Sequence, residues 1–485
     1  MPVHILGVAN QLTRGNLAIA SVILSLVTFG LAKGRQPLGK HARETGRFLG
    51  QTVARFGRLL FVDVRRGGPV VWAAAAALAF AFVFTTMLTW LLPSDSWDGV
   101  WYHDLMVGSA IQAHGYSEID MPGAGSIFVL MQQANGYPRN GEMLGLWWVI
   151  FSGRRLLEFP SVLANVPMAL ACYSLCRRYA ILGAGSSPGG RPRLGVHDRP
   201  DRWRSNAFLA AVALITIPGV RLEMRSTYID GIFGAFCTAA LFFASDSRLD
   251  AKRSVLASLA LGLAFGAKSL ALLFVPPLAV LAIVIVAFHE GRRGWYRTFA
   301  ALAFGAFAVV VFGGFIYGLN WMRYGNPFHP ISVQVGPWMF HGIIDMSVVD
   351  ANEIQNVGAD LFSIPTAGHE HPDVRRGGYG LVTGFVLLPL AVLALAGSWL
   401  GTLRQLVRCV LQRRVVPEFG ERLVVLVTAG VVGITLWKSP AIWAARYNMV
   451  AIAYFFALVF LLARTLRTPL LAGHVAAIGF ATNCM

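Results

Sequence analysis

Charged residues and cysteines are both scarce in this chain. Lys, Arg, Asp and Glu make up only 13% of its 485 residues, while hydrophobic residues make up 56%. So little charge argues against a soluble globular protein and predicts an all-α polytopic membrane protein. The five cysteines are scattered, and Cys172 and Cys176 lie one helical turn apart rather than in a CxxC pattern. They indicate neither a disulfide scaffold nor a zinc site.

Ten apolar runs are long enough, or nearly long enough, to cross a bilayer as helices. Residues 15–32 could form an eleventh span, with a signal peptide as the weaker interpretation. The apolar tail from Pro469 stays open between an interfacial and a spanning segment. The ten predicted spans are residues 69–93, 156–176, 205–220, 229–245, 254–267, 269–288, 298–320, 381–402, 423–437 and 448–464.

The formal net charge of +17 comes from basic residues in short loops between apolar runs, where they set topology. The linker 33–68 and the loops on its side of the predicted bundle hold 29 of the 41 Lys and Arg, but only nine of the 24 Asp and Glu. This side is therefore predicted to be cytoplasmic, with no nucleic-acid partner. Residues 141–153 reach only about 20 Å as a helix, and a crossing there would move the arginine-rich loop 177–204 outside. We predict that they lie on or dip into the outer face.

These patterns divide the chain into three regions. Residues 1–68 hold an apolar segment and a basic cytoplasmic linker, 69–464 form the transmembrane domain, and 465–485 are a C-terminal tail. The first outer loop, 94–155, and a large outer loop, 321–380, are expected to carry the polar chemistry.

A cluster of ionisable residues follows the first long apolar run. Asp95, Asp98, His103 and Asp104 stand where a helix leaves the membrane, which is a costly place for charge unless it has a role. Asp98 could equally be a solvated loop acid or a helix cap. His103 beside Asp104 is more often interfacial packing than a catalytic dyad.

Further polar residues fall on the same predicted face. Lys268 has only Ser269 as a polar neighbour between two apolar runs, so it must snorkel or find an anion. Arg446-Tyr447 could be an interfacial anchor. A carboxylate and several cations on one face suit a lipid-anchored phosphate donor, because cations neutralise a departing phosphate and one carboxylate suffices as general base.

Two other patterns have simple interpretations. His369-Glu370-His371 with Asp373 offers metal-binding atoms, but a solvated loop is the favoured interpretation. No metal site or cofactor is predicted, although a divalent metal is compatible with the chemistry. Gly262 and Gly266 form a GxxxG pattern, which predicts close helix packing.

Six short motifs occur in order between about residue 69 and residue 464. Together they resemble the GT-C-type membrane glycosyltransferases, which use polyprenyl-phosphate-linked sugars and include the protein mannosyltransferases and the lipid A aminoarabinose transferase. The motifs are WDGVWYHDLM, YPRNGEMLGLWW, PGVRLEMRSTYID, GLAFGAKSLALL, RYGNPFHP and AARYNM.

The resemblance implies a GT-C-like bundle of about 10–12 transmembrane helices, with juxtamembrane helices in the first outer loop. It implies a sugar donor linked to polyprenyl phosphate, a glycan, lipid or protein acceptor, and a site facing the periplasm from a bacterial inner membrane. Asp98 matches the family's loop-one acid and is the candidate base, with Asp95 and Asp104 as rivals and His103 as a further catalytic candidate. The candidate phosphate contacts are Lys268, Arg446, Arg225 and Tyr447, and the other site candidates are Tyr102, Arg139, Glu142 and Asp230.

A transporter or flippase for a lipid-linked or anionic solute is the alternative interpretation, since the same cations could bind substrate without bond breaking. Against it, the sequence shows no internal repeat, and the charges crowd one face instead of the midplane. A third class, transfer of phosphoethanolamine or another head group, is disfavoured because the sequence shows neither a soluble catalytic domain nor a convincing metal cluster.

Overall fold

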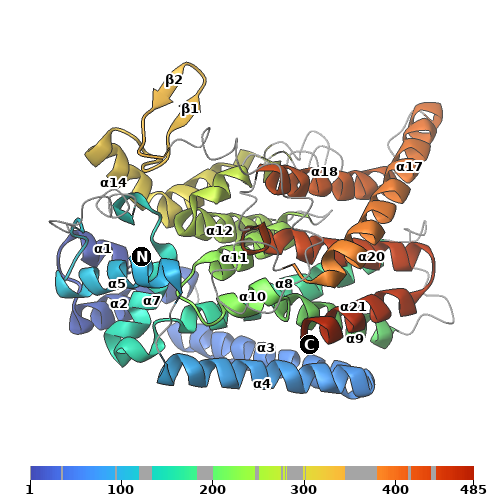
Figure 1. Ribbon diagram of the computed structural model, residues 1–485, viewed down its shortest axis with the longest axis horizontal. Coiled ribbons are helices and arrows are strands. Elements are labelled where there is room, and N and C mark those ends of the chain that lie inside the picture. Colours follow the sequence, from blue (N-terminus) through green and yellow to red (C-terminus); the bar gives the residue numbers. More distant parts are fainter. Residues whose placement is uncertain are drawn as a thin grey trace.

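The computed structural model contains helices and one short β-hairpin (Figure 1). The described helices begin near the N-terminus with α1 (Pro2–Val8), α2 (Arg14–Lys33), α3 (Leu38–Arg66), α4 (Pro69–Leu91), α5 (Asp104–Gln112) and α7 (Asn140–Ser152). The structure describes residues 2–33, 37–92, 96–119, 134–182, 200–245, 251–274, 277–278, 280, 296, 299–300, 302–344, 379–412, 417–438 and 444–484.

The rest of the chain continues the helical pattern. It contains α8 (Phe159–Leu182), α9 (Pro200–Ile215), α10 (Pro218–Glu223), α11 (Asp230–Ala244), α12 (Ala251–Ala267), α14 (Phe315–Tyr324), α17 (Leu388–Gln412), α18 (Pro417–Lys438), α19 (Ala444–Tyr447), α20 (Met449–Thr465) and α21 (Pro469–Cys484). Short 3-10 or π-helical turns are η1 (Gly99–His103), η2 (Arg154–Leu156), η3 (Ser269–Leu273) and η5 (Thr383–Leu387). The two strands are β1 (Val333–Val335) and β2 (Trp338–Phe340), which pair antiparallel.

Several helices have the length and apolar composition of membrane spans. Within the described residues five pass this test, and the bent pair of Leu302–Gly313 and Phe315–Tyr324 would make a sixth. The chain is therefore an all-α protein with membrane-length helices, as its composition predicts. Four of the ten predicted spans match these helices, and the run left open at 15–32 forms a fifth. The five are Arg14–Leu31, Pro69–Leu91, Arg154–Leu182, Thr383–Gln412 and Phe419–Trp437.

Other predicted spans form shorter helices. Those predicted at 205–220, 229–245, 254–267 and 448–464 are helices of 15 to 17 residues. The one predicted at 269–288 begins with the short turn η3, and most of its remainder lies outside the described residues. Within the described residues, length and composition thus support five or six spans, and the predicted total of ten stays a prediction.

The centre of the bundle is α20. Fourteen of its 17 residues are buried, because a helix that is apolar on every side is most stable when other helices surround it. It packs against α8, α11, α17 and α21, and Tyr454 donates a hydrogen bond of 2.7 Å from its hydroxyl to the Val425 carbonyl of α18.

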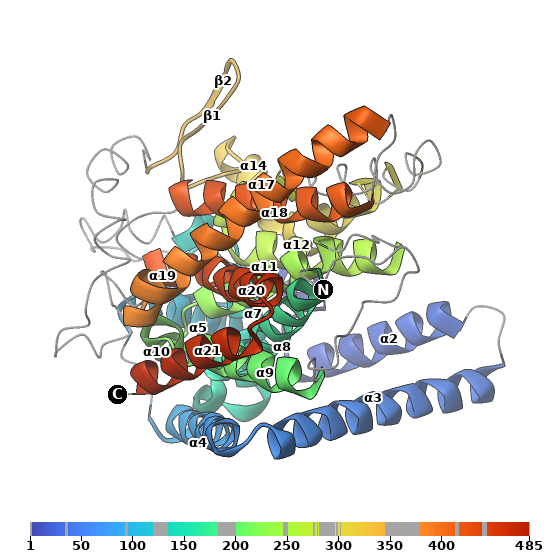
Figure 2. The same cartoon turned by 90° about the vertical axis from the view of Figure 1, so that its right-hand side faces the viewer.

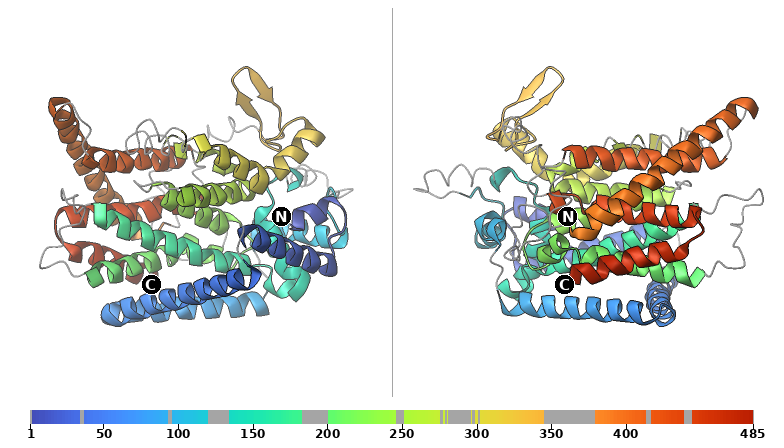
Figure 3. Two further views of the ribbon diagram at one scale, coloured as in Figure 1. Left: turned by 180° about the vertical axis from the view of Figure 1, so that it is seen from behind. Right: turned by 45° about the vertical axis from the view of Figure 1, so that its right-hand side comes forward.

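Many helices of the bundle, α4 and α20 among them, run along one direction, so the bundle has two ends (Figures 1 and 3). At one of them, Arg66, the last residue of α3, pairs with Asp201 of α9 at 2.7 Å. Arg464 at the close of α20 lies over the Trp203 ring. We name this the basic end. The opposite end holds α5 and α7 and is named the site end.

Helix α7 does not cross the bundle. Its first turn carries Glu142, which contacts His103, whereas Arg154, just beyond its last turn, contacts Asp104. Because His103 and Asp104 are neighbours in the chain, both ends of α7 lie at the site end. This arrangement agrees with the prediction that residues 141–153 stay on one side.

The GxxxG pattern at Gly262 and Gly266 lies where two helices touch along their backbones. A Cβ added to Gly262 would lie 2.5 Å from the Ala308 carbonyl oxygen, and one added to Gly266 would lie 2.8 Å from the Gly313 Cα. These distances are too short for any side chain. The sequence prediction of close helix packing is therefore confirmed, and glycine at 262 and 266 sets the separation of α12 from the helix Leu302–Gly313.

Helix α3 lies across the direction of α4. In Figure 2, α4 is seen nearly end-on, while α3 and its neighbour α2 are seen along their lengths. Only Gly67 and Gly68 join α3 to α4, and Gly68 has φ of 79°, a conformation that glycine adopts without a Cβ penalty. The chain thus turns sharply at the basic end before it enters the bundle.

Candidate functional site

Asp98 stands at the start of the π-helical turn η1, at the site end of the bundle. Its backbone N–H donates a hydrogen bond of 3.2 Å to the Tyr228 hydroxyl. Gly99 follows because a Cβ there would lie 2.2 Å from the Ser96 hydroxyl. These contacts fix the turn that presents the Asp98 carboxylate.

Arg446 gathers three carboxylates around one guanidinium. Its Nη2 lies 2.7 Å from Asp230 Oδ2 and 3.2 Å from Asp98 Oδ2, and its Nε lies 2.9 Å from Glu223 Oε1. The guanidinium also lies over the Tyr228 ring, with Cζ 4.1 Å from the ring centroid. Asp98, Glu223 and Asp230 come from different elements, so Arg446 ties η1, α10 and α11 together.

Lys268 joins the same group through Asp230. It occupies the break between α12 and η3, in extended conformation with φ of −151°, and its ammonium pairs with Asp230 Oδ1. The Nζ atom lies 3.7 Å from the centroid of the Tyr447 ring, a cation–π distance. The lysine that the sequence left without a polar partner thus has both an anion and an aromatic face.

We name Asp98, Glu223, Asp230, Lys268 and Arg446 the ion cluster. It holds three acids and two bases, and the imbalance falls on Glu223, whose side chain is only 2% exposed. Burial raises the pKa of Glu223 well above its usual 4.5, an effect that the charge of Arg446 opposes and that Asp230 reinforces. Glu223 is therefore the acid of the ion cluster that protonates most readily, and its protonation would leave two acids balanced by two bases.

Exposure separates the members of the ion cluster. Asp98 is 28% exposed and Lys268 is 21% exposed, whereas Asp230 is 1% exposed. One carboxylate and one ammonium can therefore be reached from outside, while Asp230 holds the two cations from beneath. The arrangement can present a base beside cations that would attract a phosphate.

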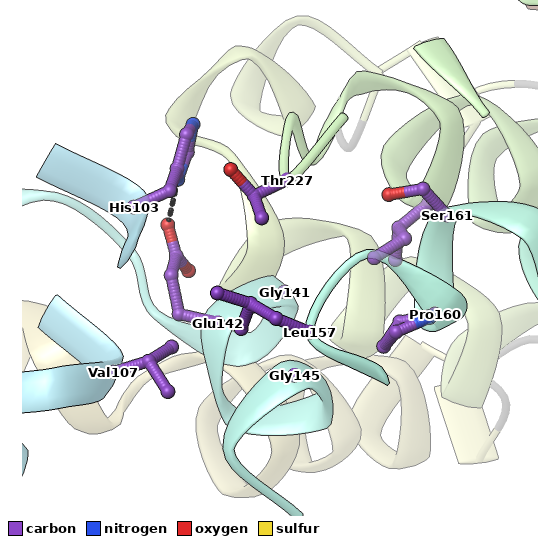
Figure 4. Close-up of a pocket in the computed structure, with 10 residues that line it drawn as sticks. His103, Val107, Gly141, Glu142, Gly145, Leu157, Pro160, Ser161 and Thr227 are labelled. Atoms are coloured by element: carbon purple, nitrogen blue, oxygen red, sulfur yellow. Dashed lines mark hydrogen bonds and ion pairs between the residues drawn. The ribbon is translucent and has the colours of Figure 1, made fainter. Parts of the chain in front are cut away.

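His103 and Glu142 form a separate buried pair. His103 Nδ1 and Glu142 Oε1 lie 2.6 Å apart, with 3% and 1% exposure. They line a small cavity of about 10 Å³, room for about one water molecule. Figure 4 shows the pair on one side of it with Thr227 nearby, and Ser161 on the other. The space is too small for a sugar or a phosphate.

Asp104 points to yet another partner. Its Oδ2 lies 2.9 Å from Arg154 Nη2, and Arg154 also pairs with Glu158 at 2.8 Å. Burial raises the pKa of Asp104, although the positive charge of Arg154 opposes the shift. The adjacent residues His103 and Asp104 are thus held by different groups and do not form a dyad with each other.

The remaining candidates from the sequence, Tyr102, Arg139 and Arg225, have different surroundings. Tyr102 packs on the Tyr137 ring at 5.3 Å between centroids, and burial raises its pKa, with Asp98 as the next contribution. Arg139 donates a hydrogen bond to the Asn135 carbonyl and lies over the Tyr116 ring. No ion pair of Arg225 is found within the described part of the chain.

Some candidates lie outside the described residues, namely Asp95 and the His369-Glu370-His371 stretch with Asp373. Within the described ranges, no group of three or more His, Cys, Asp or Glu side chains is arranged so that it could hold a metal ion. Any proposal for the site therefore starts from the ion cluster.

Two residues of this network, Glu223 and Tyr228, were not among the site candidates from the sequence. They flank the turn between α10 and α11. Their only signal was position, in the same motif as Asp230. Contact with Arg446, which lies more than two hundred residues away, could not be read from that motif.

Comparison of the chain with models of protein families, with curated proteins and with solved structures gives no match. What the fold and composition define is therefore the broad class, an all-α membrane protein with an ion cluster at one end of its bundle.

Proposed function

We propose that this chain is a GT-C-type membrane glycosyltransferase, which moves a sugar from a polyprenyl-phosphate donor to an acceptor hydroxyl at the outer face of a bacterial inner membrane. The observation that carries the proposal is the contact of Asp98, the most exposed acid of the ion cluster, with Arg446 at 3.2 Å. Asp230 links Arg446 to Lys268 in turn. The candidate base and two of the candidate phosphate contacts thus belong to one network.

In the proposed reaction, Asp98 accepts the proton of the acceptor hydroxyl as its oxygen bonds to the anomeric carbon. The bond from that carbon to the phosphate oxygen breaks, and its electron pair leaves with the polyprenyl phosphate. The phosphate gains one negative charge in this step. Lys268, which is partly exposed, and the edge of Arg446 beside Asp98 would stabilise the added charge. Displacement from the opposite side inverts the anomeric centre.

Replacement of the base tests the proposal. Asp98→Asn keeps the shape of the side chain but cannot accept the proton, so we expect transfer to fall by at least about 100-fold. The purified variant is assayed with a radiolabelled polyprenyl-phosphate sugar, and elution of the intact protein in detergent reports its folding.

The matched control is Asp201→Asn. Asp201 is also an acid paired with an arginine, but it lies at the basic end, and Arg66 and Asp201 are both well exposed. We expect this variant to keep transfer within about twofold of the unsubstituted chain, since surface pairs contribute little. Near-normal transfer by a folded Asp98→Asn variant would remove Asp98 from the base role.

A transporter or flippase remains the alternative to an enzyme. The position of the ion cluster favours the enzyme, because transporter sites ordinarily lie near the bilayer midplane, whereas these charges gather at one end of the bundle. Release of free polyprenyl phosphate from the labelled donor decides between them. A transporter would move the donor intact and release none.

A further inference from the structure

Helix α3 carries two faces of opposite character. At 3.6 residues per turn, six apolar positions fall on one stripe and five basic positions fall on the other side. The apolar stripe is Leu38, Ala42, Leu49, Val53, Phe56 and Leu60, and the basic face is Lys40, Arg43, Arg47, Arg58 and Arg65. With 29 residues, the helix is about 43 Å long.

The last turn of α3 shows where the apolar stripe points. Val64 continues the stripe and packs against the main hydrophobic core of the bundle. Arg66 pairs with Asp201 at the basic end. The side of α3 that carries Val64 therefore faces the bundle where the two meet, and the helix runs on past the bundle (Figure 2).

The basic face is open. Lys40, Arg43, Arg47 and Arg65 are exposed, and α3 as a whole has seven basic residues against two acidic ones, Glu44 and Asp63. Helices of this composition bind the boundary of an anionic bilayer, with the apolar face in the acyl region and the basic face among the head groups.

The junction with α4 places this helix at the membrane boundary. Helix α4 is apolar over 23 residues and long enough to cross a bilayer, and only Gly67 and Gly68 separate it from α3. The last turn of α3 must then lie close to the surface at which α4 enters. Since α3 runs across the direction of α4 (Figure 2), it extends along that surface instead of away into water.

We propose that α3 is an interfacial helix that binds an anionic phospholipid surface at the basic end of the bundle. Its apolar stripe lies among the acyl chains, and its lysine and arginines contact the phosphate head groups. The acyl chains thus cover the rest of the apolar stripe in the way that the bundle covers Val64 in the last turn. This inference does not depend on the proposed enzymatic function.

Two adjacent positions test the apolar stripe. Val53 falls on the stripe and Ala54 falls on the basic side, so benzoylphenylalanine at the two positions samples two different faces of the same turn. The full-length protein is placed in vesicles of equal parts phosphatidylcholine and phosphatidylglycerol and irradiated. We expect at least about tenfold more lipid adduct from position 53 than from position 54, with both variants folded by detergent elution.

Equal lipid adducts from the two positions would overturn the proposal. So would adducts at position 53 that join the helix to protein instead of lipid, since the stripe would then be a protein contact.

A charge test addresses the head groups. Arg43→Gln with Arg47→Gln removes two cations from the basic face, and we expect the ratio of phosphatidylglycerol to phosphatidylcholine in the adducts of position 53 to fall from several-fold towards one. The control pair, Arg221→Gln with Arg323→Gln, removes the same charge from exposed positions at the site end and should leave the ratio unchanged. A ratio that does not respond to the Arg43 and Arg47 substitutions would overturn the anionic part of the proposal.

Discussion

Arg446 contacts three carboxyl groups, more than its single positive charge can neutralise. Protonation of one of these acids would remove the excess negative charge. Glu223 is the member whose charge is least favourable, because burial raises its pKa and Asp230 adds to the effect. A neutral Glu223 lets Asp98 and Asp230 keep their charges beside the two cations. A proton on Glu223 would thus balance the charge of the cluster in addition to the ion pairs.

Glu223→Gln should reproduce the protonated side chain. The pKa of Glu223 is higher in the folded protein than its usual 4.5, so its contribution to stability is present below that value and is lost as pH rises through the raised pKa. Gln does not titrate. We expect the midpoint of thermal unfolding of Glu223→Gln to rise relative to that of the unsubstituted chain as pH is raised from about 5 to about 9. A constant difference across this range would contradict a protonated Glu223.

Asp230→Asn, in contrast to Glu223→Gln, should strongly destabilise the folded protein. Asp230 is 1% exposed and contacts both Lys268 and Arg446, so its loss leaves two cations without their shared partner. Breaking a buried pair in this manner costs about 3–5 kcal/mol, far more than Glu223→Gln at neutral pH. Thermal unfolding in detergent measures both variants, and an unchanged midpoint for Asp230→Asn would show that the charges are solvated.

The sequence was informative about which residues carry charge on one face but not about which of them touch. Asp98, Lys268, Arg446, Tyr447 and Asp230 are all in or against the ion cluster. His103, Asp104 and Glu142 also lie in motifs that carry the resemblance, yet their partners are outside the ion cluster. A one-residue step along a helical turn rotates a side chain by about 100°, so neighbours such as His103 and Asp104 contact different helices.

At the scale of elements, close contact between helices depends on glycine. Gly262 of α12 approaches the Ala308 carbonyl, where a Cβ would lie 2.5 Å from the oxygen. Backbone atoms cannot move aside as a flexible side chain can. This contact positions the last turn of α12, from which Lys268 follows.

Gly262→Ala should therefore destabilise the fold by about 1–3 kcal/mol through overpacking. The control is Gly430→Ala in α18, where an added Cβ would meet nothing within 4 Å. There we expect a gain of about 0.5–1 kcal/mol, because alanine is favoured over glycine inside a helix. Thermal unfolding in detergent compares the two, and equal effects would refute the packing argument.

Element positions were more predictable than element lengths. The runs at 69–93 and 381–402 were located from apolarity alone, because an uncharged stretch of this length has few alternatives in a membrane protein. The runs at 229–245 and 448–464 were also predicted as spans, but the helices that they form, α11 and α20, are shorter than a span requires by length and composition. Their apolar residues are satisfied by burial inside the bundle, which gives the same sequence pattern as contact with lipid.

At the scale of the whole molecule, α21 turns the end of the chain back along the bundle. Asn206 donates a hydrogen bond of 2.8 Å to the Pro469 carbonyl, and Asn483 donates one of 3.1 Å to the Ala213 carbonyl. Helix α21 thus runs beside α9 in the same direction, away from the basic end. The sequence left this tail open because its Gly and His residues interrupt the apolar pattern.

This arrangement predicts the compartment of two fusion proteins. Alkaline phosphatase joined after α21 should be active in whole bacterial cells, because the helix closes at the site end. The same reporter inserted at residue 190, in the arginine-rich loop, should be inactive, since basic loops stay in the cytoplasm. Activity at residue 190 or inactivity after α21 would contradict the arrangement, with a fluorescent protein at each position as the reciprocal reporter.

The break at Lys268 has an electrostatic consequence for the pair that it forms. Aligned peptide dipoles give a helix a partial positive charge at its first turn and a partial negative charge at its last. Asp230 is the first residue of α11, and Lys268 directly follows the last residue of α12. Each side chain thus carries a charge opposite in sign to the partial charge of the helix end at which it stands, as well as opposite to the charge of its partner. An exchange of the two residues would keep the ion pair but place each charge at a helix end of the same sign, which is unfavourable. The two positions are therefore not interchangeable.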